Sequence, residues 1–436
     1  MQAAQLWKKL FSQKHLKEHY YEKIKPKPSI GMDRITSKKF EEDLDDNIEI
    51  VVRKVNNNSY HFTRYRQLLF VKSATKPPRS VCIPTLRDKL TISSLNELMN
   101  EVFGNDCRTQ MPQIIIDDIL KKINDYEYFI KLDIKGFYAS ISQEQLLVRL
   151  KRKIRKKQIL NLIEKAIKTA SISYPVKNKI LMVERKRGIP EGLPISNTLA
   201  NIYMMDLDKK YSGKNNLAYY RYVDDILILV TKNDFDNVKK EIEGDIGELE
   251  LKFNEKKDEG LIEQGFEYLG YKINSFLVTV RHSGVLKIEQ SIEELLREIK
   301  NNNIKYIEWK INLKITGFIL EKRKYGWLFF YSQITDLTLL FHLDDVVRKL
   351  VERHGLKGKI KIKKFVRTYA EIHKALHVTK YIPNLDNLTI NEKKALLSEI
   401  YNIDLTGKSD EILEISFRRI MKREIRDIEK DIQNIS

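Results

Sequence analysis

Two adjacent aspartates, Asp224 and Asp225, interrupt a run of aromatic and β-branched residues between Leu217 and Val230. This composition predicts two strands joined by a tight turn, with both carboxylates at the tip of the hairpin. Strands on both sides would fix the backbone, so that carboxylates that repel each other can be held where a divalent cation neutralises them. Acidic turn residues are common, so the pair indicates a metal site only if the chain supplies further parts of one.

The chain contains three other Asp-Asp pairs, at positions 45–46, 117–118 and 344–345. All three lie in stretches with helical spacing, where a solvated helix face or a helix start is the expected role. The pair at 224 and 225 differs from them because apolar strands flank it.

A third carboxylate comes from residues 126–134, which alternate with the period of a strand. One face carries Tyr128, Ile130, Leu132 and Ile134. Asp133 lies on the other face, near the end of a strand that is otherwise expected to be buried. A carboxylate there costs free energy unless it meets a cation, so Asp133 is the candidate that completes the acidic site.

Other elements would position a substrate beside these acids. Residues 67–84 read as strand, basic Pro-containing loop and strand, with Lys72, Lys76 and Arg79 beside the turn. Such a basic hairpin can fold over a triphosphate, and a solvated loop is the alternative interpretation. The loop 188–194, of sequence GIPEGLP, enters a predicted helix over 196–211, and its glycines would let a substrate approach the backbone.

Two further predictions concern helices. Ser142 and Gln145 have the spacing of a capping box before a helix that continues to about residue 154. From about residue 290 onward the pattern is mostly helical, including residues 307–324 and a last helix over 409–432.

Length and charge limit the class of protein. The 436 residues suggest two or three domains, and 42% hydrophobic with 32% charged residues describes a globular chain with a charged surface. Lys and Arg outnumber Asp and Glu by 79 to 60, a formal charge of +19. The excess favours a polyanionic partner such as nucleic acid, and its spread over several segments suits an extended groove.

Cysteine usage and hydropathy set further expectations. Cys82 and Cys107 form no CxxC motif, so we expect no disulfide framework and no structural zinc. The basic, amphipathic start of the chain lacks the pattern of a secretory signal, and no window approaches eighteen apolar residues. We therefore expect a cytoplasmic protein without membrane association.

Several ordered segments together resemble reverse transcriptases. KLDIKGFYASI, GIPEGLPISNTLANIYM and YVDD resemble the three catalytic segments of that family, in the family's order. IGMDRIT and RSVCIPTLRDK resemble N-terminal segments of the enzymes of group II introns and their bacterial relatives. NEKK and FEYLGYKI resemble the segments that close the palm. The resemblance covers about residues 30–275.

The resemblance implies an α+β, right-hand polymerase fold with an antiparallel palm sheet packed on helices. Residues 1–280 would form fingers and palm, 281–376 a helical thumb and 377–436 a helical C-terminal extension. By the same resemblance, two divalent ions, Mg²⁺ or alternatively Mn²⁺, would be held by Asp133, the backbone carbonyl of Ile134, Asp224 and Asp225. Lys257 would act as general acid toward pyrophosphate, with Lys256 as the alternative.

Residues near the incoming nucleotide or the template are implied in the same way: Lys72, Arg79, Arg87, Tyr138, Glu191 and Gly192. Tyr138 would exclude a ribose 2′ hydroxyl, and core packing is its alternative role. Glu191 stands where the family usually has Gln. Its carboxylate would repel phosphates unless it is paired with a basic residue such as Arg185 or Arg187.

The function that the resemblance implies is RNA-directed DNA polymerase, with an RNA template, dNTPs and a DNA product. The segment KYIPN is similar to one in bacterial antiphage and abortive-infection reverse transcriptases, which favours a role in defence with a noncoding RNA. Retron and intron-type enzymes are alternatives: Ile315-Thr316-Gly317 is close to a retron motif, and no Cys/His cluster follows Tyr381. Untemplated or protein-primed synthesis, a non-catalytic RNA-binding scaffold and oligomerisation stay open.

Overall fold

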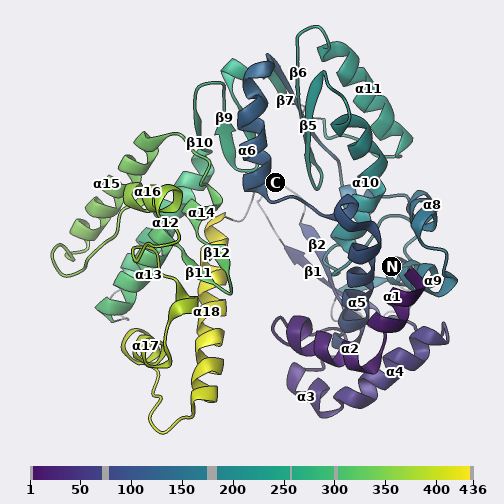
Figure 1. The fold of residues 1–436 in the computed structure, drawn as a ribbon, viewed down its shortest axis with the longest axis horizontal. Coiled ribbons are helices and arrows are strands. Elements are labelled where there is room, and N and C mark those ends of the chain that lie inside the picture. Colours follow the sequence, from purple (N-terminus) through teal and green to yellow (C-terminus); the bar gives the residue numbers. More distant parts are fainter. Residues whose placement is uncertain (1–2, 71–77, 174–183, 256–257, 299–302, 433–436) are drawn as a thin grey trace. The chain divides into compact units, whose positions relative to one another are not determined.

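The computed structural model describes residues 3–70, 78–173, 184–255, 258–298 and 303–432 (Figure 1). The chain divides into two compact units. Unit 1 comprises Met1–Gln110 and Ile130–Glu259, and unit 2 comprises Met111–Phe129 and Gly260–Ser436. Helices and sheets occur in both, which confirms the predicted α+β class. The three domain boundaries expected from the resemblance stay predictions.

A four-stranded sheet carries the acidic hairpin. Its strand order is β5-β6-β3-β7, with β5 Leu217–Tyr222, β6 Asp225–Val230, β3 Tyr128–Asp133 and β7 Asp258–Leu261. Strand β6 lies between two neighbours, and its residues from Ile226 to Val230 have no exposed surface. Its continuous apolar sequence suits a strand that is covered on both faces. Helix α10 (Ser196–Ser212) packs against β5.

A second sheet of unit 1 has the order β2-β1-β4. Strands β1 (Tyr65–Phe70) and β2 (Arg79–Ile83) pair in antiparallel fashion, as the sequence predicts, and β4 (Ser171–Ser173) runs parallel to β1. The basic loop 71–77 between the first two strands, with Lys72, lies outside the described residues.

Helices supply most of the rest of unit 1: α1 (Ala3–Leu10), α2 (Gln13–His19), α3 (Ser37–Glu42), α4 (Leu44–Asn56), α5 (Leu86–Phe103), α7 (Phe137–Ser140), α8 (Gln143–Lys153), α9 (Lys157–Lys168) and α11 (Phe235–Glu248). The capping box predicted for α8 is wrong. The Ser142 side chain, which precedes that helix, makes no cap hydrogen bond. The Gln145 side chain donates to the Glu248 carbonyl and the Glu250 carboxylate.

Unit 2 contains a small sheet of order β10-β9-β8, a two-stranded hairpin and a helical array. Its elements are α6 (Pro112–Lys122), β8 (Phe266–Tyr268), β9 (Tyr271–Ile273), β10 (Val278–Val280), α12 (His282–Arg297), α13 (Ile304–Thr316), β11 (Phe318–Leu320), β12 (Arg323–Tyr325), α14 (Trp327–Phe330), α15 (Leu337–Arg353), α16 (Phe365–Lys374), α17 (Ile390–Ala395) and α18 (Asp410–Ile432).

The helix expected through residues 307–324 ends early. Gly317, with φ of 63°, stops α13, and the chain continues as the β11–β12 hairpin. A Cβ atom at this glycine would lie 2.2 Å from the Tyr325 carbonyl oxygen, so only glycine fits the close approach of the two backbones.

The last helix is part of the core of unit 2. Apolar residues of α13, β11, α18 and the segments between them form one buried cluster: Leu313, Phe318, Leu385, Leu397, Leu405, Leu413, Phe417, Met421 and Ile428. The predicted helix over 409–432 is confirmed, and it buries its apolar stripe against α13 and β11.

The other Asp-Asp pairs have structural roles. Asp117 and Asp118 lie on α6 and pair with lysines one turn later, and residues 45–46 lie in the first turn of α4. Asp344 differs from the predicted solvated face, because its carboxylate accepts hydrogen bonds from the backbone N–H groups of Phe365 and Val366 at the start of α16. Within the described ranges no helix is long and apolar enough to span a bilayer.

Candidate active site

The hairpin places its two aspartates at different depths. Tyr222 pairs with Asp225 across β5 and β6, so Val223 and Asp224 form a two-residue turn. Val223 has φ of 59°, a conformation that hairpin turns require but that a β-branched residue rarely adopts. Asp224 lies in the turn, and Asp225 begins β6 with 8% of its surface exposed. Strained backbone of this kind persists only where neighbouring structure holds it.

Strand β3 brings Asp133 to the same end of the sheet. The backbone N–H of Ile134 donates to the Asp224 carbonyl oxygen at 3.1 Å. Asn254 fixes Asp133 twice: its backbone N–H donates to the Asp133 carbonyl at 2.8 Å, and its side-chain amide donates to the carboxylate at 2.6 Å. Residues 91 positions apart in the sequence (224 − 133) thus become neighbours, as the sequence predicts.

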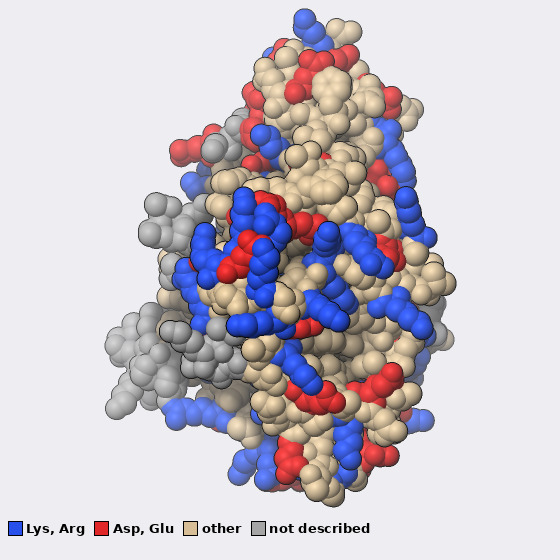
Figure 2. All heavy atoms as spheres, turned by 90° about the vertical axis from the view of Figure 1, so that its left-hand side faces the viewer, with Lys and Arg blue, Asp and Glu red and all other residues tan. Residues whose placement is uncertain are grey.

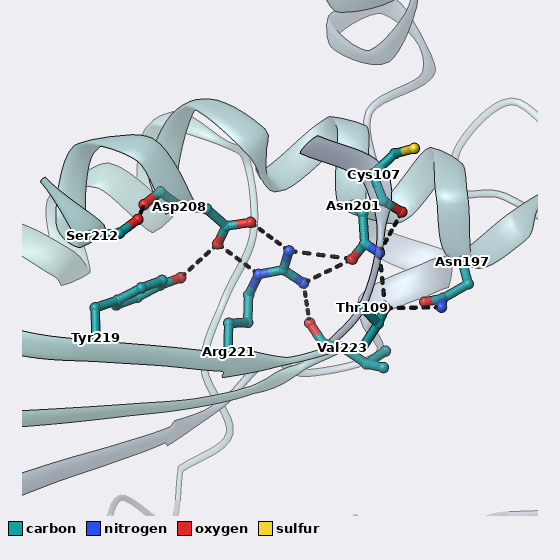
Figure 3. Close-up of polar contacts among 9 residues, drawn as sticks. All are labelled: Cys107, Thr109, Asn197, Asn201, Asp208, Ser212, Tyr219, Arg221 and Val223. Carbon is teal, nitrogen blue, oxygen red and sulfur yellow. Dashed lines mark hydrogen bonds and ion pairs between the residues drawn. The ribbon is translucent and has the colours of Figure 1, made fainter. Parts of the chain in front are cut away.

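Arg221 ties the turn to α10 (Figure 3). Its guanidinium donates to the Val223 carbonyl at 2.8 Å. It also donates to the Asp208 carboxylate, from Nε at 2.8 Å and from Nη2 at 2.5 Å. Only 7% of the Arg221 side chain is exposed, so the pair is largely shielded from water. A planar fork can satisfy all these acceptors at once, which makes Arg221 the residue that holds the strained turn.

The polar network continues from Arg221 to the other side of the site (Figure 3). Asn201 accepts from Arg221 and donates to Thr109 Oγ1 at 2.9 Å. Asn197 donates to the same hydroxyl at 3.1 Å, and the Tyr138 hydroxyl lies 3.5 Å from Asn197 Oδ1. One set of hydrogen bonds therefore connects the Tyr138 hydroxyl with the turn that carries Asp224.

Tyr138 lies in the electric field of the site. The pKa of its hydroxyl is raised to about 12, with burial as the largest cause and the charges of Glu191 and Asp224 as further causes. The charges of Arg79 and Arg221 oppose this shift. The phenol is therefore protonated at neutral pH. Its ring extends from α7, immediately after the strand that carries Asp133.

Glu191 pairs with a basic residue, as expected, but that residue is Arg79 and neither Arg185 nor Arg187. Both Nε and Nη2 of Arg79 contact the Glu191 carboxylate, while Arg187 pairs with Glu250 and Arg185 donates to the Ser171 hydroxyl. Burial lowers the pKa of Arg79, but the hydrogen bond and charge of Glu191 outweigh burial and raise it. Strand β2, which begins with Arg79, lies beside the loop that carries Glu191, because the backbone N–H of Cys82 donates to the Glu191 carbonyl at 2.7 Å.

Gly192 fits the loop closely against β2. Its φ is 94°, and a Cβ atom there would lie 2.5 Å from a methyl group of Val81. The glycine thus allows the loop backbone to approach the strand that carries Arg79, which agrees with its predicted place near the site.

Of the other predicted residues, the structure describes Arg87 and Ile134. Arg87 lies on the first turn of α5, where its charge acts on the buried hydroxyl of Tyr60. Lys72, Lys256 and Lys257 fall outside the described residues. Ile134 is buried and forms an antiparallel bridge with Phe253.

The donor types of the acidic site suit a hard divalent cation. Its candidate donors are oxygen atoms alone: the carboxylates of Asp133, Asp224 and Asp225 and the carbonyl of Ile134. Oxygen donors are the set that Mg²⁺ and Mn²⁺ prefer. Sequence reasoning missed Arg221 and Asn254, the two side chains that hold the acids in place. The signal for Arg221 was an arginine within an apolar strand, two residues before the turn.

Comparisons with known proteins agree with this geometry. Residues 22–273, more than half of the chain, match the family described as reverse transcriptase (RNA-dependent DNA polymerase). The chain is 27% identical over 173 residues to the group II intron-encoded protein LtrA of Lactococcus lactis subsp. cremoris, covering 38% of this chain and 28% of that protein. It is 22% identical over 292 residues to protein YkfC of Escherichia coli, covering 56% and 75% of the two chains.

The first of these matches spans little more than a quarter of its relative's length. Among solved structures, the chain is similar to telomerase from Candida tropicalis in complex with a fragment of telomeric RNA, with a TM-score of 0.44 and 15% identity over 86% of this chain and 65% of that chain. Because the family match covers more than half of the chain and includes all three aspartates, the chain belongs to the reverse transcriptase (RNA-dependent DNA polymerase) family.

Proposed function

We propose that this chain copies an RNA template into DNA, adding dNTPs to a primer 3′ hydroxyl at the site formed by Asp133, Asp224 and Asp225. The observation that carries the proposal is the hydrogen bond from Ile134 to the Asp224 backbone, which brings the first and third catalytic segments together. Family membership supports polymerase chemistry, and this juxtaposition supports the residues that perform it.

The three aspartates and the Ile134 carbonyl would hold two Mg²⁺ ions. Such ions, when bound, lower the barrier by activating the 3′ hydroxyl and stabilising the pyrophosphate leaving group. The chain's own part is to hold the carboxylates in place: Asn254 orients Asp133, and Arg221 fixes the turn before Asp224.

The surrounding residues would select and orient the nucleotide. Tyr138, on the connected polar network, would exclude a ribose 2′ hydroxyl by the bulk of its ring. Arg79 would meet the triphosphate, and its pairing with Glu191 would be exchanged in part for phosphate contacts. Lys257 is proposed as the general acid toward pyrophosphate.

RNA would bind partly along unit 2. The segment from residue 359 to 380 carries six exposed Lys and Arg residues, here called the basic face: Lys359, Lys361, Lys364, Arg367, Lys374 and Lys380. Figure 2, which faces the side of α15 and α16, shows Lys and Arg side chains concentrated across the middle of this view. A run of exposed cations suits the phosphate backbone. A role with a noncoding RNA in bacterial antiphage defence is part of the proposal, supported by the KYIPN segment.

Primer extension on a primed RNA template with Mg²⁺, omitting each dNTP in turn, tests the proposal. We expect each omission to stop extension immediately before the first template position that calls for the missing nucleotide. Products whose lengths ignore the template would contradict templated synthesis and favour untemplated addition. Products formed without a primer would favour protein-primed synthesis.

A further inference from the structure

A second cluster of metal-binding side chains lies away from the aspartates, where α2 packs against α5. His15 and His19 are four residues apart on α2, so both imidazoles lie on one face of that helix. Glu97 lies on α5, with Ser93 one turn before it. The family's catalytic segments include none of these four residues.

The distances in this cluster suit coordination of a single ion. Glu97 Oε2 lies 3.2 Å from His15 Nε2 and 3.1 Å from His19 Nδ1. Donor atoms bound to one zinc ion at about 2.0 to 2.2 Å lie roughly 3 to 3.5 Å from one another. Within the described ranges this is the only group of three His, Cys, Asp or Glu donor atoms that all lie within 4.8 Å of each other.

The environment of His19 is that of a metal ligand held by a second partner. Its other ring nitrogen, Nε2, lies 2.7 Å from the Ser93 hydroxyl, a contact that fixes the ring and leaves Nδ1 facing Glu97. Only 6% of His19 is exposed, so its ring is enclosed where α2 packs against α5.

Two imidazoles, with ring centroids 5.7 Å apart, converge on one carboxylate oxygen. The carboxylate can accept an N–H from each neutral ring, or all three groups can coordinate one cation between them, with the donor nitrogens unprotonated. The Glu97 side chain is 37% exposed and that of His15 is 19% exposed, which leaves a side open for a water ligand.

We propose that His15, His19 and Glu97 bind one zinc ion that joins α2 to α5. Two nitrogen donors and one oxygen donor suit zinc better than Mg²⁺, so this site is chemically distinct from the all-oxygen site of the aspartates. The expectation of no structural zinc rested on the cysteines. It overlooked a histidine pair whose third ligand comes from a helix some eighty residues later.

Zinc binding to the full chain tests this site. Protein freed of metal with a chelator is titrated with ZnCl₂ in excess Mg²⁺, and bound zinc is counted by mass spectrometry. We expect one tightly bound equivalent and a rise in Tm. His15→Gln and Glu97→Gln should each weaken zinc binding by at least about 100-fold and remove the rise in Tm. His61→Gln, at an exposed histidine of unit 1, is the matched control and should keep both.

Two results would overturn the proposal: no tight equivalent in the wild type, or unchanged zinc binding in both ligand variants. X-ray absorption of the zinc-loaded wild type gives an answer even if the variants do not fold. Scattering from two imidazoles with nitrogen at about 2.0 to 2.1 Å is expected, and a zinc shell without imidazole would overturn the site.

Discussion

Arg221 decides how firmly the acidic turn is held, because its guanidinium is the group that joins the Val223 carbonyl to Asp208 and Asn201. Lysine keeps the charge but cannot donate to three acceptors in one plane. Arg221→Lys should therefore lower kcat by at least about tenfold, with little change in KM for dNTPs.

Steady-state primer extension measures this effect, and thermal unfolding shows whether the fold survives. Tyr219→Phe is the control: it removes another hydrogen bond to Asp208, of 2.9 Å, without touching the turn. If Arg221→Lys lost only stability, or changed KM alone, the positioning role would be wrong.

Glu191 limits the availability of Arg79 for phosphate. Glu191→Gln removes the carboxylate that competes with the triphosphate for the guanidinium. We expect KM for dNTPs to fall by roughly threefold to tenfold, with kcat nearly unchanged, in single-nucleotide incorporation assays. Glu184→Gln makes the same charge change at an exposed position before the loop and should have no effect. A rise in KM for Glu191→Gln would show that the pair orients Arg79 for the nucleotide.

At the scale of single residues, the sequence predicts the side chains expected to take part in the chemistry. It misses the side chains that hold them in place. Asp133, Asp224 and Asp225 were recognisable because a carboxylate beside apolar strand residues costs free energy unless a cation neutralises it. Arg185 and Arg187 are close to Glu191 in the sequence, whereas Arg79 lies 112 positions away. Only the pairing of β2 with the loop selects Arg79 as the partner. Asn254 donates its side-chain amide to Asp133 across 121 positions, which no local pattern reveals.

Helices α13 and α18 are joined by two buried lysines. Lys310 contacts Glu424 at 2.5 Å and Asp427 at 3.0 Å, and Lys314 contacts Asp431 at 2.6 Å. Removing one member of a buried pair leaves its partner charged and unpaired, so Lys310→Met should lower the free energy of unfolding by about 3 to 5 kcal/mol. The double variant Lys310→Met, Glu424→Leu should recover most of the loss. Denaturant titration measures both, and a double variant as unstable as the single one would contradict the account.

The pH dependence of this contact follows from its pKa shifts. Burial lowers the pKa of Lys310, but Glu424 and Asp427 outweigh it and raise the pKa above 10.5. Burial likewise raises the pKa of Asp427, and Lys310 outweighs it and lowers that pKa below 3.8. The stability that Lys310 contributes is thus present below pH 10.5, and that of Asp427 is present above pH 3.8 and is lost as the pH falls further. The stability difference between wild type and Lys310→Met should be constant across neutral pH and shrink as the pH falls below 3.8.

Elements with a strong local pattern were predictable, and those that depend on a distant contact were not. The period-two strand before Asp133 and the helix over 196–211 appear as expected. The β11–β12 hairpin was missed because its residues also suit a helix, and only the close approach of Gly317 to Tyr325 breaks the pattern. The polar interior of α13 and α18 was hidden because each helix alone looks amphipathic.

For the molecule as a whole, the basic face predicts how RNA affinity depends on salt. Lys361→Gln with Lys364→Gln should weaken RNA binding and reduce the slope of log K against log salt by about 1.4, since each phosphate contact on a single strand contributes about 0.7. Arg348→Gln with Lys349→Gln removes the same charge from α15, where Asp345 and Glu352 already pair with it, and is the control. Equal effects of the two pairs in filter-binding titrations would mean that net charge alone binds RNA.

The family was also predictable at this scale. Ordered segments from separate parts of the sequence are specific where a single YVDD is not, and the match over residues 22–273 confirms the reverse transcriptase resemblance and its α+β polymerase fold. The domain boundaries, the template and the cytoplasmic location stay predictions, because they depend on partners and motions that no sequence pattern records.

The measurement that tests the central claim most directly is single-turnover dNTP incorporation by Asp133→Asn, Asp224→Asn and Asp225→Asn on a primed RNA template. Asp236→Asn, at an exposed position on α11, is the control. We expect the first two variants to lose at least about a thousandfold in rate, about 4 kcal/mol in the barrier, with a smaller loss for Asp225→Asn and unchanged RNA binding. An Asp133→Asn or Asp224→Asn variant that still extends the primer at the rate of the control would contradict the claim.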